Sequence, residues 1–449
     1  MRNLFSSSRV LLFAGLVVTT ASHAQNAYLT NAFMPRYAKA ATDYPITVRV
    51  RNSVATPLIT FRVDWQWNNG PVQMGNFQST TGISGNQYWP YQHPISFNQA
   101  QGVGVLKIWV VGSGDTDHTN DTLTFPMGIL GNWAVKTVLL EQFTGTWCQF
   151  CPLPNDTTNA LDLDPQVVVA KHHNADEFSS PASTAYWNQY NSNFSPTATL
   201  EQGEQGTYIA NANYPLWRNE VELRKTGVSP VTLAINPEFN YWSGELSVDI
   251  SATFTYGLTG DLIINAYIVE DNVPGPQTSA PPGYIHQQVV REVLGGGAGT
   301  SGVIPATTVA GVPYAHTYNF SVPIEWNSYN LRIVATVSQR VGSTLHALNA
   351  GSGNFVAVGV AERTDLSSAL TVFPNPCSTE LWITLPGDPA NATVELIAAD
   401  GREVMSRRLV IGNEAVHLDG FEAIAPGAYT VRVQRGDAFA ERRVVKLAH

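Results

Sequence analysis

The sequence predicts a mostly β protein with one α/β unit, and three observations support this fold class. Charged residues make up only 13% of the 449 residues, while Gly (36) and Pro (27) are frequent, a composition typical of β-rich exported modules. Short segments alternate apolar and polar residues between Gly, Asn and Pro clusters, as strands do. One segment near residue 148 changes from a buried strand to a helix that begins at a cysteine pair. The net charge of −10 argues against a nucleic-acid-binding surface.

Residues 1–24 predict a cleavable signal peptide. Arg2 and Arg9 form a positive start, residues 10–18 are apolar, and Ser22-His23-Ala24 is a small-x-small exit. The apolar run is too short for a membrane anchor, and no later stretch is long enough to span a bilayer. We therefore expect a secreted or cell-surface protein without a membrane span, in a compartment where disulfides form.

Residues 25–132 predict an antiparallel β-sandwich. Strict alternation over 46–51, 60–67 and 104–111 indicates its strands, and the pattern resembles Ig-like adhesion-type domains of bacterial surface proteins. The acidic segment 115–121 could hold calcium, but it lacks EF-hand spacing and reads better as a turn. Five aromatic residues could bind glycans or partners, although their strand spacing favours core packing: Trp65, Trp67, Tyr88, Trp89 and Tyr91.

The most reactive feature is the Cys148-x-x-Cys151 pair. It follows a buried strand over 138–143 and precedes a weak helix over 154–162. Two residues between cysteines at a helix start bring the sulfurs within bonding reach, so we expect a Cys148–Cys151 disulfide or a reactive pair. Free N–H groups of the first helical turn favour a Cys148 thiolate. A zinc site would need two further ligands, and Cys377 lies in the separate C-terminal module, so we expect no metal.

The order strand–CxxC–helix–strand continues through a strand over 166–171 and a helix over 212–225. It resembles a thioredoxin-like domain, here residues 135–227. The flanking Trp147 and Pro152 strengthen the resemblance. It implies a cis-proline facing the cysteines, and Pro196 after Ser195, before the β-prone residues 197–200, is the candidate.

The chain departs from the thioredoxin pattern at three points. The buried acid expected six residues before the first Cys is Gln142 here, while Glu141 lies one place earlier and on the opposite face of the strand. Gln149-Phe150 replaces the usual Gly-Pro dipeptide. No clear final strand closes the sheet.

Residues 228–363 predict a second β-sandwich, with strands over 230–235, 245–254, 261–269, 317–322 and 331–337 and a long Pro/Gly loop over 271–305. The segment from Leu140 through Cys148-x-x-Cys151-Pro152, the strand ending at His172, and residues 289–291 together resemble the outer-membrane-protein-28-related family over about 135–350. The resemblance implies a thioredoxin-like unit fused to a β-sandwich in a surface or secreted protein.

Residues 369–449 predict a small separate β-domain. Its motifs resemble the C-terminal sorting domain of the type IX secretion system: Pro374-Asn375-Pro376 after a strand, a hairpin at Asp400-Gly401, and Gly427 and Tyr429 before the terminal strand. The resemblance implies that the type IX machinery is a partner and routes the protein across the outer membrane. Cys377 then belongs to this removable domain.

Other chemical motifs are weaker. Adjacent His172 and His173, near Asp176 and Glu177, could suggest a metal site, but neighbouring strand residues face opposite sides. Gly297-x-Gly299-x-x-Gly302 fits a dinucleotide fingerprint without its strand and helix. A Gly-x-Ser-x-Gly elbow is absent from the sequence. The sequence thus predicts no cofactor.

Two function hypotheses follow. In the first, the protein is a thiol–disulfide oxidoreductase that acts on protein thiols or disulfides, with Cys148 as attacking thiolate, Cys151 as resolving thiol and Pro196 beside them. In the second, it is a non-enzymatic adhesin that binds cell-surface ligands, and Cys148–Cys151 is a structural disulfide. Loss of the acid at Gln142 favours the second, and the intact Trp147-Cys148-x-x-Cys151-Pro152 favours the first.

Overall fold

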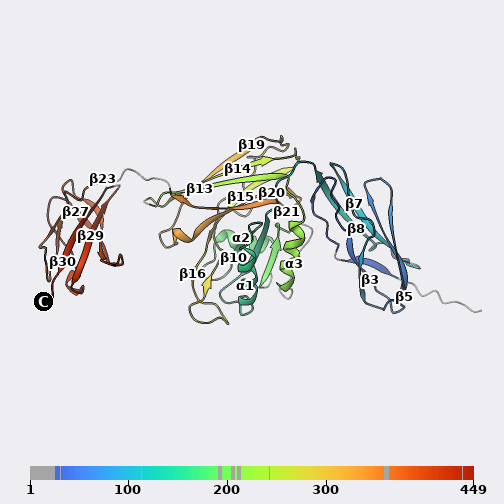
Figure 1. Ribbon diagram of the computed structural model, residues 1–449, viewed down its shortest axis with the longest axis horizontal. Coiled ribbons are helices and arrows are strands. Elements are labelled where there is room, and N and C mark those ends of the chain that lie inside the picture. Colours follow the sequence, from blue (N-terminus) through green and yellow to red (C-terminus); the bar gives the residue numbers. More distant parts are fainter. Residues whose placement is uncertain are drawn as a thin grey trace, which may run out of the picture. The chain divides into compact units, whose positions relative to one another are not determined.

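The computed structural model describes residues 26–448 except 31, 113, 191–194, 204–207, 210–213, 242, 358–363 and 437. The expected signal peptide, residues 1–24, therefore lies outside the described residues. In the described part the protein is mostly β, as the sequence predicts, with several sheets and three α-helices (Figure 1). No helix in these described ranges is long and apolar enough to cross a membrane.

The N-terminal module consists of two sheets around one core. Apolar residues of β3 alternate with exposed ones, so that Val48 and Val50 are fully buried while Thr47 and Arg49 face solvent. Together with residues such as Val63 and Ile108 they form the core. The smaller sheet has the order β1 (Ala27–Thr30), β3 (Thr47–Asn52), β6 (Tyr88–Gln92). The larger has the order β2 (Tyr37–Lys39), β8 (Thr122–Leu130), β7 (Gly102–Gly112), β4 (Leu58–Trp67), β5 (Gln73–Ile83).

The aromatic residues of this module divide into two groups. Trp65 and Tyr91 are buried and Trp67 packs against the core, as strand spacing predicts. Tyr88 and Trp89 on β6 remain 47% and 41% exposed. Core packing therefore accounts for three of the five.

An eight-stranded sheet holds the cysteine pair. Its order is β12 (Tyr208–Ile209), β11 (Thr197–Leu200), β9 (Val138–Thr144), β10 (Val167–His173), β18 (Val289–Val293), β15 (Asp261–Glu270), β20 (Leu331–Val341), β21 (Thr344–Asn354). β9 and β10 are parallel, with α1 (Pro152–Leu161) between them in the chain. β11 runs antiparallel to β9, and β12 antiparallel to β11. α2 (Pro181–Gln189) follows β10 and α3 (Tyr214–Lys225) follows β12.

This sheet continues across the boundary expected at residue 227. β18 pairs in parallel with β10, with Lys171 opposite Val289, and β15 and β20 extend the sheet from there. Strands expected in a separate sandwich thus share one sheet with the cysteine strand. β9 and β10 are buried along their whole length because side chains cover both faces.

Side-chain alternation divides the residues of β9 and β10 between two faces. Leu140 and Val169 join the cluster that includes Trp217 of α3, on the face shared with α1. Phe143 and Ala170 join the cluster that includes Tyr186 and Trp187 of α2. By alternation, Gln142 and His173 lie on the α1 face, and Glu141 and His172 lie on the α2 face.

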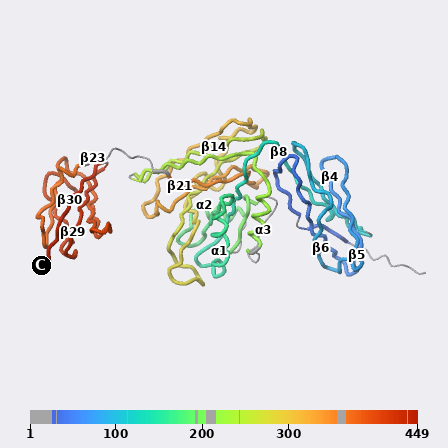
Figure 2. Tube along the Cα trace, viewed as in Figure 1, coloured from blue at the N-terminus to red at the C-terminus, as the bar shows by residue number. Residues whose placement is uncertain are grey.

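The remaining strands form smaller sheets. A four-stranded sheet has the order β19 (Pro313–Ser321), β14 (Glu245–Phe254), β13 (Val231–Phe239), β22 (Val356–Ala357). The loop expected over 271–305 contains the hairpin β16 (Val273–Pro274) and β17 (Ile285–His286) as well as β18. Figure 2 shows this yellow loop beside the green trace of α1; the phenol OH of Tyr284 accepts a 3.0 Å bond from Asn155 of α1. A short 3-10 helix covers Ser328–Asn330.

The C-terminal domain has its own core, which includes Leu396, Phe421 and Val431. One sheet has the order β23 (Thr364–Asp365), β30 (Ala438–Lys446), β29 (Gly427–Arg435), β26 (Ala390–Ala398), β27 (Glu403–Ile411). The other has the order β24 (Thr371–Phe373), β25 (Trp382–Thr384), β28 (Val416–His417), and a 3-10 helix covers Phe421–Ala423. Gly401 adopts a positive φ of 85° in the β26–β27 turn, the hairpin that Asp400-Gly401 predicts.

Candidate functional site

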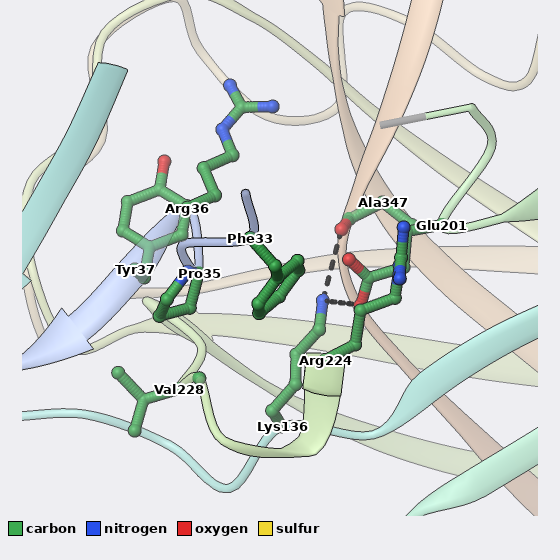
Figure 3. Close-up of a pocket in the computed structure, with 10 residues that line it drawn as sticks. Phe33, Pro35, Arg36, Tyr37, Lys136, Glu201, Arg224, Val228 and Ala347 are labelled. Atoms are coloured by element: carbon green, nitrogen blue, oxygen red, sulfur yellow. Dashed lines mark hydrogen bonds and ion pairs between the residues drawn. The ribbon is translucent and has the colours of Figure 1, made fainter. Parts of the chain in front are cut away.

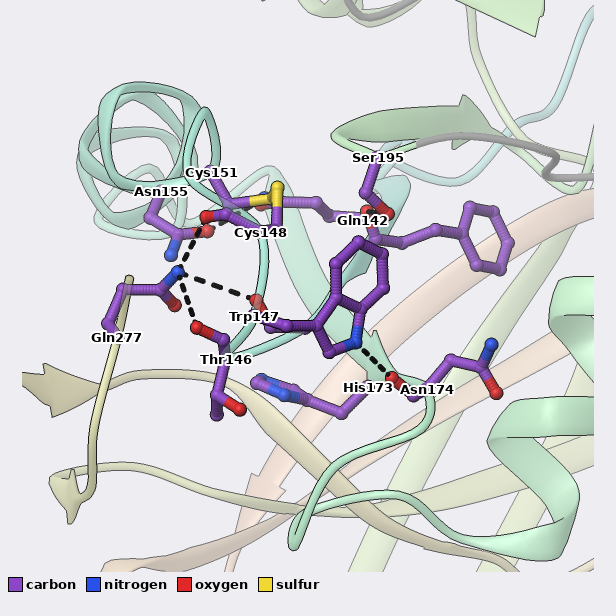
Figure 4. Close-up of a disulfide and its surroundings, with 12 residues drawn as sticks. Gln142, Thr146, Trp147, Cys148, Cys151, Asn155, His173, Asn174, Ser195 and Gln277 are labelled. Carbon is purple, nitrogen blue, oxygen red and sulfur yellow. Dashed lines mark hydrogen bonds between the residues drawn. A yellow bond between two sulfur atoms is a disulfide. The ribbon is translucent and has the colours of Figure 1, made fainter. Parts of the chain in front are cut away.

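Cys148 and Cys151 form a disulfide where β9 gives way to α1 (Figure 4). Cys151 is the N-cap of α1 and Pro152 is its first residue, a position at which proline needs no hydrogen-bonding N–H. Cys148 is only 3% exposed and Cys151 is fully buried. We call residues 145–151 the cysteine turn.

Two loops hold the cysteine turn. The N–H of Thr146 donates to Asp176 Oδ2 at 2.8 Å, and the carbonyl of Thr146 accepts from the N–H of Thr278 at 2.8 Å. Gln277 Nε2 donates to the carbonyl oxygens of Cys148 at 2.8 Å, Thr146 at 3.3 Å and Gly145 at 3.4 Å (Figure 4). The turn is thus fixed from the loop after β10 and from the loop between β16 and β17.

Beneath the turn lies a neutral hydrogen-bonded network. Gln142 occupies the position six residues before Cys148, where a buried acid is expected, and it is fully buried. Its Nε2 donates to Asn155 Oδ1 at 2.7 Å, and its Oε1 accepts from the hydroxyl of Thr158 at 2.8 Å. Both partners lie on α1. Because every member is an amide or a hydroxyl, no group in this network is charged at neutral pH.

Glu141 lies on the opposite face, as alternation predicts. Its Oε1 accepts from the hydroxyl of Tyr267 at 3.0 Å and lies 3.4 Å from His172 Nε2. Burial, with the Glu141 charge beside it, raises the pKa of Tyr267 well above its ordinary value. Glu141 is therefore separated from the disulfide by the sheet and does not replace the missing acid.

His173 and Asp176 lie on the cysteine side. Asp176 Oδ2 accepts from His173 Nδ1 at 2.7 Å, while His172 contacts Ser183 and Tyr186 on the α2 face. Burial alone would raise the pKa of Asp176, but the bonds from His173, Thr146 and Phe178 outweigh burial and lower the pKa. The two adjacent histidines thus face opposite sides, and no cluster of three potential metal-ligating residues occurs among the described residues.

Two further buried bases lie near this site. Lys171 on β10 is 2% exposed, and its Nζ donates to Asn159 Oδ1 of α1 at 2.6 Å. Burial lowers the pKa of Lys171 to about 7. Burial and the neighbouring His173 lower the pKa of His286 to about 4.

An open groove adjoins the disulfide. Pro196 lies in it, directly before β11, and the Ser195–Pro196 peptide bond is cis. Phe150 and Leu153 remain 65% and 61% exposed along the groove, and Trp147 nearby is 47% exposed. The residues lining the groove are mainly apolar: Gln149, Phe150, Pro152, Leu153, Pro196, Tyr214 and Ser279.

A small cavity lies beside Lys136, just before β9 (Figure 3). The Lys136 amine lies 2.7 Å from Glu201 Oε1 and donates to the carbonyls of Leu348 at 2.9 Å and Ala347 at 3.2 Å. The cavity has a volume of about 20 Å³, room for one water. It is therefore a structural feature and too small for an organic ligand.

The residues of the expected sorting motif lie at the start of the C-terminal domain and on its penultimate strand. Asn375 donates to the carbonyl of Arg443 at 2.8 Å and accepts from the N–H of Val445 at 2.9 Å, so it binds the last strand. It lies between Pro374 and Pro376. Gly427 begins β29, and Tyr429 on the same strand donates its hydroxyl to Ala425 O at 2.8 Å. Cys377 is a buried free thiol in this domain.

Several solved structures are similar to this chain at low sequence identity and low TM-score. The CARDB domain of a Pyrococcus furiosus protein aligns at 10% identity and a TM-score of 0.20, covering 24% of this chain and 90% of that one. Salmonella alpha-2-macroglobulin aligns at 9% identity and a TM-score of 0.24, covering 95% of this chain and 24% of that one. An ICAM-5 D1–D4 ectodomain fragment aligns at 8% identity and a TM-score of 0.21, over 95% and 78%. The curated proteins give no match.

Family models match two segments and confirm the resemblances seen in the sequence. The model for outer membrane protein Omp28 matches residues 183–351, from α2 through most of β21, and therefore excludes the cysteine pair. The model for the secretion system C-terminal sorting domain matches residues 371–447. A sorting domain marks an exported protein that is secreted or held at the cell surface. The chain thus carries an Omp28-family segment followed by a secretion system C-terminal sorting domain.

Proposed function

We propose that this exported protein carries out thiol–disulfide exchange through a thioredoxin-like unit, with Cys148 as the attacking and attacked sulfur. The observation that carries the proposal is the position of the disulfide at the N-terminus of α1, directly after β9. There the unpaired N–H groups of the first turn favour a thiolate. The element order β9-α1-β10-α2-β11-β12-α3 and the strand order β12-β11-β9-β10 support the thioredoxin-like assignment. The final strand of the sheet is not evident from the sequence pattern, and the short β12 is our candidate for it.

The exchange proceeds in two balanced steps. A thiolate of a partner protein attacks Cys148 Sγ, the Cys148–Cys151 bond breaks, and Cys151 leaves as a thiolate that takes up a proton. A second partner thiolate then attacks the partner sulfur of the mixed disulfide and releases Cys148. Two electrons and two protons pass from the partner dithiol to Cys148 and Cys151, and the partner gains a disulfide. The reverse sequence reduces a partner disulfide.

The groove beside the disulfide supports binding of a partner polypeptide. Two of its apolar side chains, Phe150 and Leu153, are exposed to a degree unusual for residues of this size, and buried Pro196 lines the groove beside them. Binding of an extended partner segment there would bury this surface and bring the partner sulfur to Cys148. Trp147, Pro152 and Pro196 then support the exchange, while Glu141 on the other face does not take part.

A second candidate function is supported by the burial of the disulfide. Cys148 is 3% exposed, and a neutral Gln142 lies below it. A shielded disulfide without a proton acceptor suits a structural link, and the protein would then act as a surface adhesin through its β domains. Half-exposed Tyr88 and Trp89 on β6 are candidate contact residues for a cell-surface ligand.

The reduction potential of Cys148–Cys151 in the purified exported chain distinguishes the two functions. For exchange we expect a potential between about −120 and −270 mV, and a mixed disulfide that accumulates when Cys151→Ser removes the resolving thiol. Cys148→Ser is the matched control and should trap nothing. A potential below about −300 mV, with no trapped species, would support the structural disulfide and the adhesin function.

A further inference from the structure

Gln277 lies outside the cysteine turn and makes three side-chain hydrogen bonds to its main chain. It lies 129 residues from Cys148 in sequence, between β16 and β17, and is 6% exposed. Its Nε2 donates to three carbonyl oxygens, those of Gly145, Thr146 and Cys148. Because all three acceptors are carbonyls, only the NH₂ end of the amide can face them, and the orientation of the side chain is fixed.

None of these carbonyls depends on Gln277 for a partner. Gly145 O accepts from the N–H of Cys148 at 3.0 Å, Thr146 O from Thr278 at 2.8 Å, and Cys148 O from Cys151 at 3.3 Å. Gln277 Oε1, in contrast, is buried without a hydrogen-bond partner among the described residues. A buried acceptor without a partner destabilises the fold, so hydrogen-bond satisfaction does not explain a glutamine at this position.

The electrostatic effect of the amide on Cys148 explains why a glutamine occupies position 277. The carbonyl of Cys148 belongs to the same peptide group as the N–H of Gln149, the first N–H after the attacking cysteine. A donor on that carbonyl polarises the peptide and strengthens its N–H. The positive end of the Gln277 amide also offsets the negative ends of three carbonyl dipoles next to Cys148. Both effects favour negative charge on the Cys148 sulfur.

We propose that Gln277 is a positioning residue for exchange at Cys148, acting through the cysteine turn to stabilise the Cys148 thiolate. The inference rests on the proposed exchange function. It assigns to the loop between β16 and β17 a role in setting the reactivity of a cysteine on a distant part of the chain.

The test compares the thiolate pKa of Cys148 in four versions of the full exported chain. All carry Cys151→Ser, so that Cys148 titrates without a coupled neighbour. Iodoacetamide alkylation is followed against pH, with Cys148 identified by peptide mass. Gln277→Met, which keeps the length and removes the donors, should raise the pKa by about 0.5 unit, and Gln277→Glu by about 1 unit or more. Gln287→Met is the control, since Gln287 bonds with Asn272 instead, and it should leave the pKa unchanged.

The outcomes separate this inference from the proposed function. If Gln277→Glu does not fold, as judged by circular dichroism, Gln277→Met still decides, because every carbonyl keeps another donor. A natively folded Gln277→Met whose Cys148 pKa stays within about 0.2 unit of the parent overturns the inference. If, in that case, the Cys148–Cys151 potential lies between about −120 and −270 mV and Cys151→Ser traps a mixed disulfide, the proposed function stands. A potential below about −300 mV with no trapped species overturns the proposed function and this inference with it.

Discussion

Asp176→Asn tests how firmly the cysteine turn is anchored. The Asp176 side chain is 2% exposed and accepts four bonds: Oδ2 from Thr146 N–H at 2.8 Å and His173 at 2.7 Å, and Oδ1 from Phe178 N–H at 3.0 Å and Ser179 at 3.0 Å. Asparagine offers one acceptor oxygen. In either orientation of the amide, the backbone N–H of Thr146 or of Phe178 faces an NH₂ group and loses its acceptor.

The magnitude follows from these bonds. An N–H without an acceptor costs about 1–3 kcal/mol, and the two bonds that remain lose their charge assistance, which weakens each by up to about 1 kcal/mol. We expect the free energy of unfolding around the turn to fall by about 3 kcal/mol at pH 7. The pKa of Asp176 is lowered by folding, so its contribution is present above about pH 4 and is lost as pH falls through that lowered pKa. The difference between parent and variant should therefore shrink below pH 4.

Hydrogen–deuterium exchange across a urea series measures this difference locally. Peptides from β9 and β10 report on the stability of the eight-stranded sheet separately from that of the other domains. Asp43→Asn is the control, because exposed Asp43 accepts only an exposed bond from Asn98, and it should change stability by less than about 0.5 kcal/mol. A loss below about 1 kcal/mol at pH 7, or a loss that is equally large at pH 3.5, would refute the anchoring role.

Three further predictions concern two buried bases and one exposed asparagine of the sorting domain. Folding lowers the pKa of Lys171 to about 7, which destabilises the fold below about pH 10.5. Lys171→Met should therefore raise the unfolding temperature at pH 7. A gain in unfolding temperature that does not shrink towards pH 10.5 contradicts this prediction. Folding lowers the pKa of His286 to about 4, so the parent should lose stability from about pH 6.5 down to pH 4; His286→Gln should flatten that decline in thermal unfolding, and a parallel decline argues against it. Asn375→Ala removes two bonds to the last strand and should destabilise the sorting domain by about 1–2 kcal/mol, seen in its calorimetric transition, whereas exposed Asn391→Ala should not.

The strand content could be predicted from the sequence, but the sheet arrangement could not. Alternation such as that of Val48 and Val50 identifies a strand with one buried face. β15 is buried at nine consecutive positions, and such a run does not indicate which sheet the strand joins. The pairing of Lys171 with Val289 joins distant segments, and no local pattern encodes it. Strands that precede and follow the expected boundary at residue 227 therefore belong to one continuous sheet.

Helix α2 shows a different limit. Its sequence has little amphipathic pattern, so periodicity does not predict it. The start signals were nevertheless present: Ser180 is the N-cap, its side chain accepts from the N–H of Ser183, and Pro181 is the first residue. Weighing cap residues together with periodicity would have identified this helix.

The cysteine pair and the opposite orientations of Glu141 and Gln142 followed from spacing and alternation, which are local rules. Gln277 did not, because it lies in a loop that reads as a Pro/Gly connection. Its partners are main-chain carbonyls, which every residue has, so no side-chain pattern in the sequence marks the contact. The sequence offered one signal that this site is unusual, namely the amide of Gln142 in place of the expected acid.

That amide is part of a wider pattern around the disulfide. Gln142, Asn155 and Gln277 surround the cysteine turn with carboxamides, whose charge does not change with pH. Asp176 reaches the turn only through the N–H of Thr146, and its lowered pKa keeps it ionised at neutral pH. When the reduced protein attacks a partner disulfide, the rate should then follow the ionisation of Cys148 alone, rising tenfold per pH unit below the Cys148 pKa and levelling above it. A second inflection between about pH 5 and 8 would require a titrating group in contact with the sulfurs, and His173 would then be the first residue to replace.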